Sequence, residues 1–171
     1  MARKPILSIS WSECLSQRLD KPEDCPRLAI LGIGNELHGD DAAGIMVARG
    51  LQTALAGRKD VLVLEAGLAP ENCTGVLRRF GPELVLLVDA AQMDAEPGDI
   101  RWLAMEQIAG LSASTHSLPL SMLARYLHLE LGSPVYLLGI QPGDLSFAAG
   151  LTSGVQSAVD TLIQTLICLL Y

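Results

Sequence analysis

The sequence predicts a three-layer α/β/α sandwich around a mostly parallel β-sheet. From Leu28 onward, short apolar runs typical of buried strands alternate with longer segments in which apolar residues recur at helical spacing. This alternation is typical of βαβ units, whose helices cover both faces of a parallel sheet. Half of the 171 residues are apolar and 18% are charged, which indicates one folded domain, spanning 28–171, with a sizeable core.

Residues 1–27 differ in composition and are predicted to form an N-terminal appendage. The run Ser10-Trp11-Ser12-Glu13 fits a capping box, in which the first and last side chains each bond the other residue's backbone amide. Pro22 and Pro26 then interrupt the chain before the first strand. One face of the predicted helix carries the apolar residues Leu7, Trp11, Cys14, Leu15 and Leu19.

The predicted domain contains five strands and four helices. The strands are expected at 28–33, 61–65, 84–89, 99–103 and 135–140, and the helices at 42–56, 72–80, 118–131 and 153–170. The last helix has the clearest pattern, an apolar stripe of Val155, Ala158, Val159, Leu162, Ile163, Leu166, Ile167 and Leu170. Thr152 or Ser153 can cap its first turn.

Composition excludes several classes of protein. A net charge of −7 argues against a nucleic-acid partner. No apolar run reaches the roughly 18–20 residues that a membrane span needs, and no apolar segment follows Arg3 and Lys4 as a signal peptide requires. We therefore expect a cytoplasmic protein without a membrane partner. The cysteines are widely spaced and predict reduced thiols instead of a disulfide frame or zinc site: Cys14, Cys25, Cys73 and Cys168.

Polar residues stand where the predicted strands end. These are the Asp40-Asp41 pair after the first strand, Glu65 at the end of the second, Asp89 at the end of the third and Gln141 after the last. Parallel strands bring their carboxyl ends to one edge of the sheet, so these residues can converge. Asp89 closes an apolar run, where a carboxylate is costly unless it has a partner.

A histidine adds to this set. His116 lies in a Ser/Thr-rich loop just before a predicted helix whose expected cap is Ser117. A helix N-terminus disfavours imidazolium, so His116 would stay neutral and able to bind a metal. Two carboxylates and one imidazole make an incomplete site for a divalent transition metal.

Each of these residues also has a structural interpretation. Asp40 or Asp41 could cap the helix that follows, and Asp89 could bond backbone amides at its strand end. His116 could be an ordinary loop histidine, and Glu65 a solvated strand end.

Three further positions are weaker candidates for the site. His38 is a weaker ligand candidate, and His128 is expected on a helix surface. Residues 141–144, Gln-Pro-Gly-Asp, could face a substrate but are expected to form a turn.

Other known chemistries fit poorly. Leu37 stands where a dinucleotide-binding fingerprint needs its third glycine, and neither a Walker loop nor a G-x-S-x-G elbow occurs. Cys73 has no histidine at a spacing that suggests a thiol protease. A hydrolase built on this chain would therefore work without a recognisable nucleophile.

Several stretches, taken in order, resemble the [NiFe] hydrogenase maturation proteases. They are GIGNELHGDDAAG (32–44), EAGLAPEN (65–72), LVLLVDAAQMDAEPGDI (84–100), STHSLPLSML (114–123) and VYLLGIQP (135–142). Within this family the chain most resembles the endopeptidases that process the large subunit of formate-hydrogenlyase-type hydrogenases. The resemblance runs from about Leu28 to Leu166, with departures at Ala42-Ala43 and at Glu65-Ala66-Gly67.

The resemblance implies a twisted five-stranded sheet and a cytosolic endopeptidase. Such an enzyme removes a C-terminal extension from the precursor of a [NiFe] hydrogenase large subunit after nickel insertion. By motif position the metal-contacting residues fall on Asp41, Asp89 and His116, and Asp41 and Asp89 are the candidates for catalysis. The nickel is carried by the substrate, no organic cofactor is expected, and the enzyme is expected to be an aspartyl-type monomer.

Two other functions remain open at this point. The chain could be a checkpoint or chaperone that binds the nickel-loaded large subunit without cutting it, because no nucleophile is recognised. It could also be an unrelated small metallohydrolase on the same fold.

Overall fold

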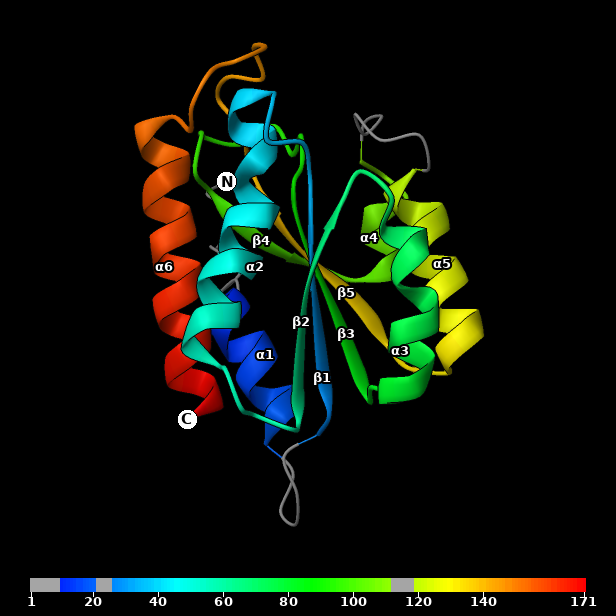
Figure 1. Ribbon diagram of the computed structural model, residues 1–171. Coiled ribbons are helices and arrows are strands. Elements are labelled where there is room, and N and C mark those ends of the chain that lie inside the picture. The colour runs from blue at the N-terminus through cyan, green and yellow to red at the C-terminus, as the bar shows by residue number, and fades with distance from the viewer. Residues whose placement is uncertain (1–9, 21–25, 112–118) are drawn as a thin grey trace, which may run out of the picture.

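The computed structural model describes residues 10–20, 26–111 and 119–171 and shows a sheet between two helical layers (Figure 1). The strands are β1 (Leu28–Ile33), β2 (Val61–Gly67), β3 (Leu84–Ala90), β4 (Ile100–Leu103) and β5 (Val135–Ile140). The helices are α1 (Trp11–Leu19), α2 (Ala43–Ala54), α3 (Thr74–Phe80), α4 (Met105–Ile108), α5 (Leu120–Leu131) and α6 (Ser153–Leu170), with two 3-10 helices, η1 (Gly39–Ala42) and η2 (Pro70–Cys73). The predicted fold class is confirmed.

The sheet has the order β2-β1-β3-β5-β4, and β4 alone runs antiparallel to its neighbour. Figure 1 shows the twisted sheet with α1, α2 and α6 on one face and α3, α4 and α5 on the other. The alternation of side chains along β1 explains this arrangement, since Leu28 and Ile30 join the first helical layer and Ala29 and Leu31 the second. A strand buried on both faces needs a continuous apolar run.

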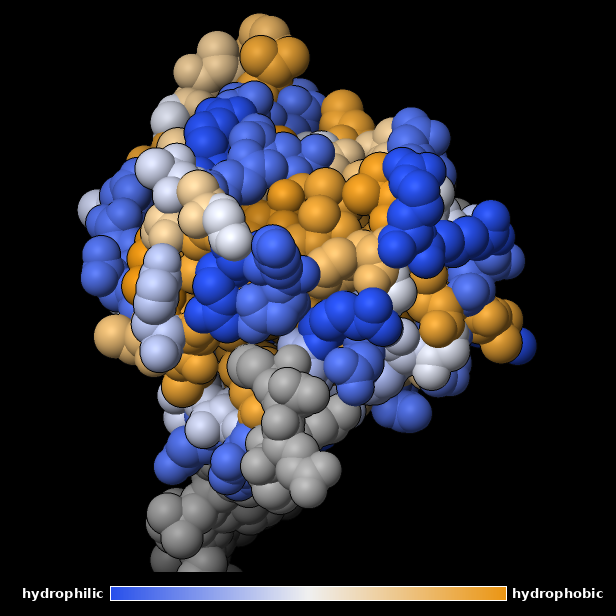
Figure 2. Space-filling model, turned by 60° about the horizontal axis from the view of Figure 1, so that its bottom comes forward, coloured by the Kyte–Doolittle hydropathy of each residue, from blue (hydrophilic) through white to orange (hydrophobic). Residues whose placement is uncertain are grey.

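Strand β2 forms one open edge of the sheet. Leu62, Val63 and Leu64 are only half-buried there, and Figure 2 shows apolar surface between hydrophilic groups on the face that carries this edge. Gln52 of α2 reaches over the edge and donates its Nε2 to the Val63 carbonyl at 3.2 Å. A side chain that hydrogen-bonds a backbone carbonyl of an edge strand makes that carbonyl unavailable for pairing with a strand of another chain.

Strands β1 and β5 and helix α6 have the predicted bounds. The predicted helix 72–80 instead begins as η2 at Pro70, because proline fits the first position of a helix. The short helix α4 was not predicted, since four residues are too few to show helical periodicity. The expected cap of the 118–131 helix, Ser117, lies outside the described residues.

Helix α1 begins as predicted. Ser10 Oγ accepts the Glu13 amide at 3.2 Å, and Glu13 Oε2 accepts the Ser10 amide at 2.8 Å, so the capping box is confirmed. Leu15 and Leu19 are buried in the core that α2 and α6 share with the sheet. The guanidinium of Arg18 lies 4.4 Å from the ring centroid of Tyr136. The division of the chain at residues 27 and 28 stays a prediction, although α1 shares this core.

Helix α6 is long and apolar enough to cross a membrane by length and composition alone. Its apolar stripe, however, is buried against α2 and the sheet, at Val155, Ala158, Val159, Leu162, Leu166 and Leu170. The opposite side carries exposed polar residues such as Gln156 and Asp160. This is the pattern of an amphipathic core helix.

Close contact between α2 and the sheet depends on Gly44. A Cβ at this position would lie 2.1 Å from the Val88 carbonyl oxygen and 2.3 Å from that of Ile33. We expect Gly44→Ala to lower the free energy of unfolding by about 3 kcal/mol, as overpacking against backbone does. Gly75→Ala in α3 is the control, since its nearest atom is 3.8 Å away.

The two variants separate packing from helix propensity. Gly75→Ala should be neutral or stabilising by up to about 1 kcal/mol, because alanine favours helix. Chemical denaturation of both variants checks the contrast, and equal stabilities would contradict it.

Candidate active site

The carboxyl ends of β1, β3 and β5 meet at one edge of the sheet, where η1 and the β5–α6 loop also lie (Figure 1). Asp41 in η1 is 2% exposed, and Asp89 near the end of β3 is fully buried. Helix η1 packs against β3, so the two carboxylates belong to adjoining elements. Buried carboxylates at such an edge are typical of a ligand site in open α/β sheets.

The loop after β1 folds tightly enough to bring Asp41 back to the strand end. Gly34 has φ 144°, and a Cβ there would lie 1.8 Å from the Asp41 carbonyl oxygen. Asn35 donates its amide to that same oxygen at 3.1 Å, and the Asp41 amide donates to the His38 carbonyl at 3.0 Å. Glycine is therefore required at position 34, because any side chain would push η1 away from β1.

Asp89 lies on the face of the sheet covered by α3, α4 and α5. It shares that face with Val85 and Leu87, four and two residues before it, which are buried in the same layer. Its backbone is paired with Gly139 of β5. The segment that joins α4 to α5 contains His116, which lies outside the described residues. The shared site of Asp41, Asp89 and His116 therefore stays a prediction. Within the described ranges, no three His, Cys, Asp or Glu side chains gather as metal ligands.

Asp40 has a different role from its neighbour. Its Oδ2 accepts the amides of Gly143 and Asp144 at 2.8 and 2.9 Å and the Thr152 hydroxyl at 2.9 Å. Its Oδ1 accepts the Thr152 amide at 2.7 Å. The Asp40 side chain thus binds the β5–α6 loop and the N-cap residue of α6, and not the helix that follows it in sequence. The interpretation of Asp40 as a cap of α2 is wrong, because its partners come from 103 to 112 residues away.

Removing the Asp40 carboxylate should loosen this loop. We expect Asp40→Ala to lower the free energy of unfolding by about 2 kcal/mol, because it leaves the amides of Gly143, Asp144 and Thr152 without their acceptor. In a domain of this size the melting temperature should fall by roughly 4–8 °C. Asp144→Ala is the control, since the Asp144 carboxylate bonds the nearby Ser146 in an exposed loop. Thermal unfolding of both variants checks this, and equal melting temperatures would contradict it.

Two other strand-end residues are structural. Gln141 is buried, its Oε1 accepts the Met93 amide at 2.8 Å, and its Nε2 donates to Gln92 Oε1 at 3.1 Å. It therefore anchors the loop after β3. Glu65 is exposed and pairs with Arg49 at 2.7 Å, as expected for a solvated strand end.

The remaining sequence candidates also have structural partners. His38 Nδ1 lies 3.3 Å from the Leu145 carbonyl. His128, half-buried on α5, lies 2.9 Å from the Ser133 carbonyl. Burial and then the Glu71 carboxylate raise the pKa of the Cys73 thiol above its usual range. A thiol with a raised pKa is a poor nucleophile, which agrees with the exclusion of thiol chemistry.

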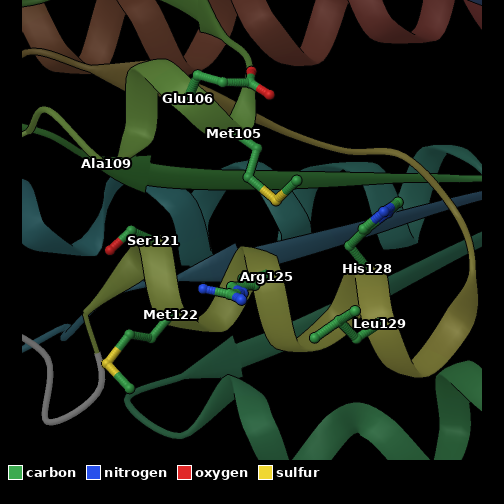
Figure 3. Close-up of a pocket in the computed structure, with 8 residues that line it drawn as sticks. All are labelled: Met105, Glu106, Ala109, Ser121, Met122, Arg125, His128 and Leu129. Atoms are coloured by element: carbon green, nitrogen blue, oxygen red, sulfur yellow. The ribbon is translucent and has the colours of Figure 1, made fainter.

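A hollow of about 480 Å³ lies between α4 and α5 on the outer side of the second helical layer (Figure 3). Neither Asp41 nor Asp89 lines it. The lining residues are Met105, Glu106, Ala109, Ser121, Met122, Arg125, His128 and Leu129. This hollow is therefore separate from the carboxylate edge.

Comparison with known proteins identifies the family. The family model described as HycI, hydrogenase maturation protease, matches residues 45–168. The chain belongs to the hydrogenase maturation protease family. The Hydrogenase 3 maturation protease of Escherichia coli K12 is 36% identical over 138 residues, which are 80% of this chain and 86% of that protein.

Solved structures of maturation proteases have the same fold. The crystal structure of the [NiFe] hydrogenase maturation protease HycI from Thermococcus kodakarensis KOD1 has a TM-score of 0.81 at 32% identity, covering 92% of this chain and 98% of that one. The solution structure of the endopeptidase HycI from Escherichia coli has a TM-score of 0.70 at 36% identity, covering 80% and 86%. This maturation protease is therefore a peptide-bond hydrolase, and the resemblance seen in the sequence is confirmed. Because the chain belongs to this family, nothing supports the alternative that it is an unrelated small metallohydrolase.

Proposed function

We propose that this protein is the endopeptidase that removes the C-terminal extension from a [NiFe] hydrogenase large-subunit precursor after nickel insertion. The observation that carries the proposal is the 36% identity to the Hydrogenase 3 maturation protease over 80% of the chain. The architecture supports it, because two buried carboxylates lie at the sheet edge where such folds bind ligands.

In this proposal the nickel belongs to the substrate, and Asp41, Asp89 and His116 are the protein groups that engage it. Carboxylate oxygens and an imidazole nitrogen are suitable donors for a divalent transition metal. Burial at the sheet edge supports this role for Asp41 and Asp89. The hydrolytic water can lose its proton to one of the two carboxylates or be activated by the nickel ion.

We further infer that the protein acts in the cytoplasm as a monomer without an organic cofactor. The cysteines in the described part of the chain, Cys14, Cys73 and Cys168, are free thiols, as a reducing compartment favours. The apolar stripe of α6 is already buried within the chain.

Mass spectrometry of a nickel-loaded precursor incubated with the protein tests the function. Loss of mass at the C-terminus of the large subunit is the expected result. Stable binding without a change in mass would instead support a non-catalytic checkpoint that recognises the loaded large subunit.

A further inference from the structure

Two loops at the carboxylate edge expose apolar side chains to solvent. Leu37, in the loop after β1, is 59% exposed, and Leu145 and Phe147, in the β5–α6 loop, are 39% and 69% exposed. We call these three side chains the loop-tip patch. Figure 1 shows the two loops next to each other, at the top of the molecule, beyond the start of α2. Exposed aromatic and aliphatic groups gathered in this way mark interaction sites.

The patch is held by hydrogen bonds between the two loops. Ala148 donates its amide to the Leu37 carbonyl at 2.8 Å, and Asp40 donates its amide to the Asp144 carbonyl at 2.8 Å. Ala148 has φ 58°, a left-handed conformation that costs an alanine about 1–2 kcal/mol and needs such support. The ring of His38 packs edge-on against Phe147, with 5.6 Å between centroids. A surface already ordered in this way loses little conformational entropy on binding.

The patch is directly continuous with the candidate active site. Leu37 and Asp41 belong to the same tight loop, in which the Asp41 amide donates to the His38 carbonyl at 3.0 Å. Asp40 joins the second loop to the same segment through its four accepted hydrogen bonds. A protein substrate placed with its reacting bond near Asp41 therefore has neighbouring side chains over the patch.

We propose that the loop-tip patch is a docking surface for apolar side chains of the large-subunit precursor. This inference rests on the proposed function, because it names the surface by which the same site holds its protein substrate. Two other exposed apolar side chains, Met122 and Leu129, instead line the hollow between α4 and α5. Removing one large anchor side chain from an interface of this kind typically weakens binding by tenfold or more.

Steady-state processing of a nickel-loaded precursor by Phe147→Ser and by Leu37→Ser tests the inference. Each variant should raise KM by about tenfold and leave kcat within about twofold, because the patch contributes binding and not chemistry. Melting temperatures should stay unchanged, since both side chains are exposed. Leu129→Ser is the matched control, as Leu129 is 72% exposed but lines the hollow between α4 and α5.

Unchanged KM values for Phe147→Ser and Leu37→Ser would overturn the docking role, as would a loss confined to kcat. Failure of the wild-type protein to cut the precursor would overturn the proposed function instead. In that case equilibrium binding of the precursor decides the docking role: weaker binding by Phe147→Ser but not by Leu129→Ser would support it, and equal binding would refute it.

Discussion

Asp89→Asn is expected to abolish processing of a nickel-loaded precursor while the protein stays folded. The amide keeps the shape of the side chain but loses the negative charge that a divalent ion or a proton-accepting role requires. We expect cleavage to fall by at least about 100-fold, which corresponds to roughly 2.7 kcal/mol of lost transition-state stabilisation. Asp89 is fully buried, and asparagine has nearly the same volume and shape, so the melting temperature should stay close to that of the wild type.

The matched control is Asp160→Asn on the exposed side of α6. The Asp160 carboxylate accepts a hydrogen bond from Gln156 at 3.0 Å, and an asparagine oxygen can accept the same bond. This variant should process the precursor like the wild type. Near wild-type cleavage by Asp89→Asn would reject its role at the site. Lost cleavage together with a fall in stability of more than about 3 kcal/mol would assign Asp89 to the fold instead.

Much of the fold could be predicted because it follows from patterns of apolar and capping residues that are close together in the sequence. The bounds of β1 follow from a single apolar run, since a strand buried on both faces has few polar positions. The stripe along α6 and the capping box at Ser10 are likewise properties of a few neighbouring residues. Helix α4 and the start of η2 at Pro70 escaped prediction, because neither is long enough to show a period.

The roles of the site residues, in contrast, depend on tertiary contacts that local sequence patterns do not show. Asp40 and Asp41 are adjacent and chemically identical, yet the Asp40 carboxylate is hydrogen-bonded to the β5–α6 loop. Only the tertiary structure shows that this loop is its partner. Gln141 looked like a site residue because it ends a strand, but its partners are the loop residues Gln92 and Met93. The loop-tip patch also had no sequence signal, since Leu37 and Phe147 are 110 positions apart in numbering and meet only through the loops that carry them.

Cleavage is expected to require nickel in the precursor and not nickel supplied to the enzyme. In the proposed site, Asp41, Asp89 and His116 would offer three protein ligands, two of them hard carboxylates, so they should hold free nickel weakly. In this proposal, thiolates of the client's own active site would bind the same ion more tightly, and the enzyme would only complete its coordination shell. Enzyme stripped with a chelator should therefore cut a nickel-loaded precursor and leave a metal-free one intact, a difference of at least about 100-fold by mass spectrometry, or roughly 2.7 kcal/mol in the barrier.

Two controls distinguish nickel held by the precursor from nickel held by the enzyme. Loading nickel into the metal-free precursor should restore its cleavage, whereas incubating the enzyme with nickel and then desalting it should not. Equal cleavage of the nickel-loaded and metal-free precursors would show that the enzyme does not recognise the nickel ion. Asp41 and Asp89 would then act on the peptide bond without the metal, one carboxylate taking a proton from the attacking water and the other carboxyl group, in its protonated form, giving a proton to the leaving amine.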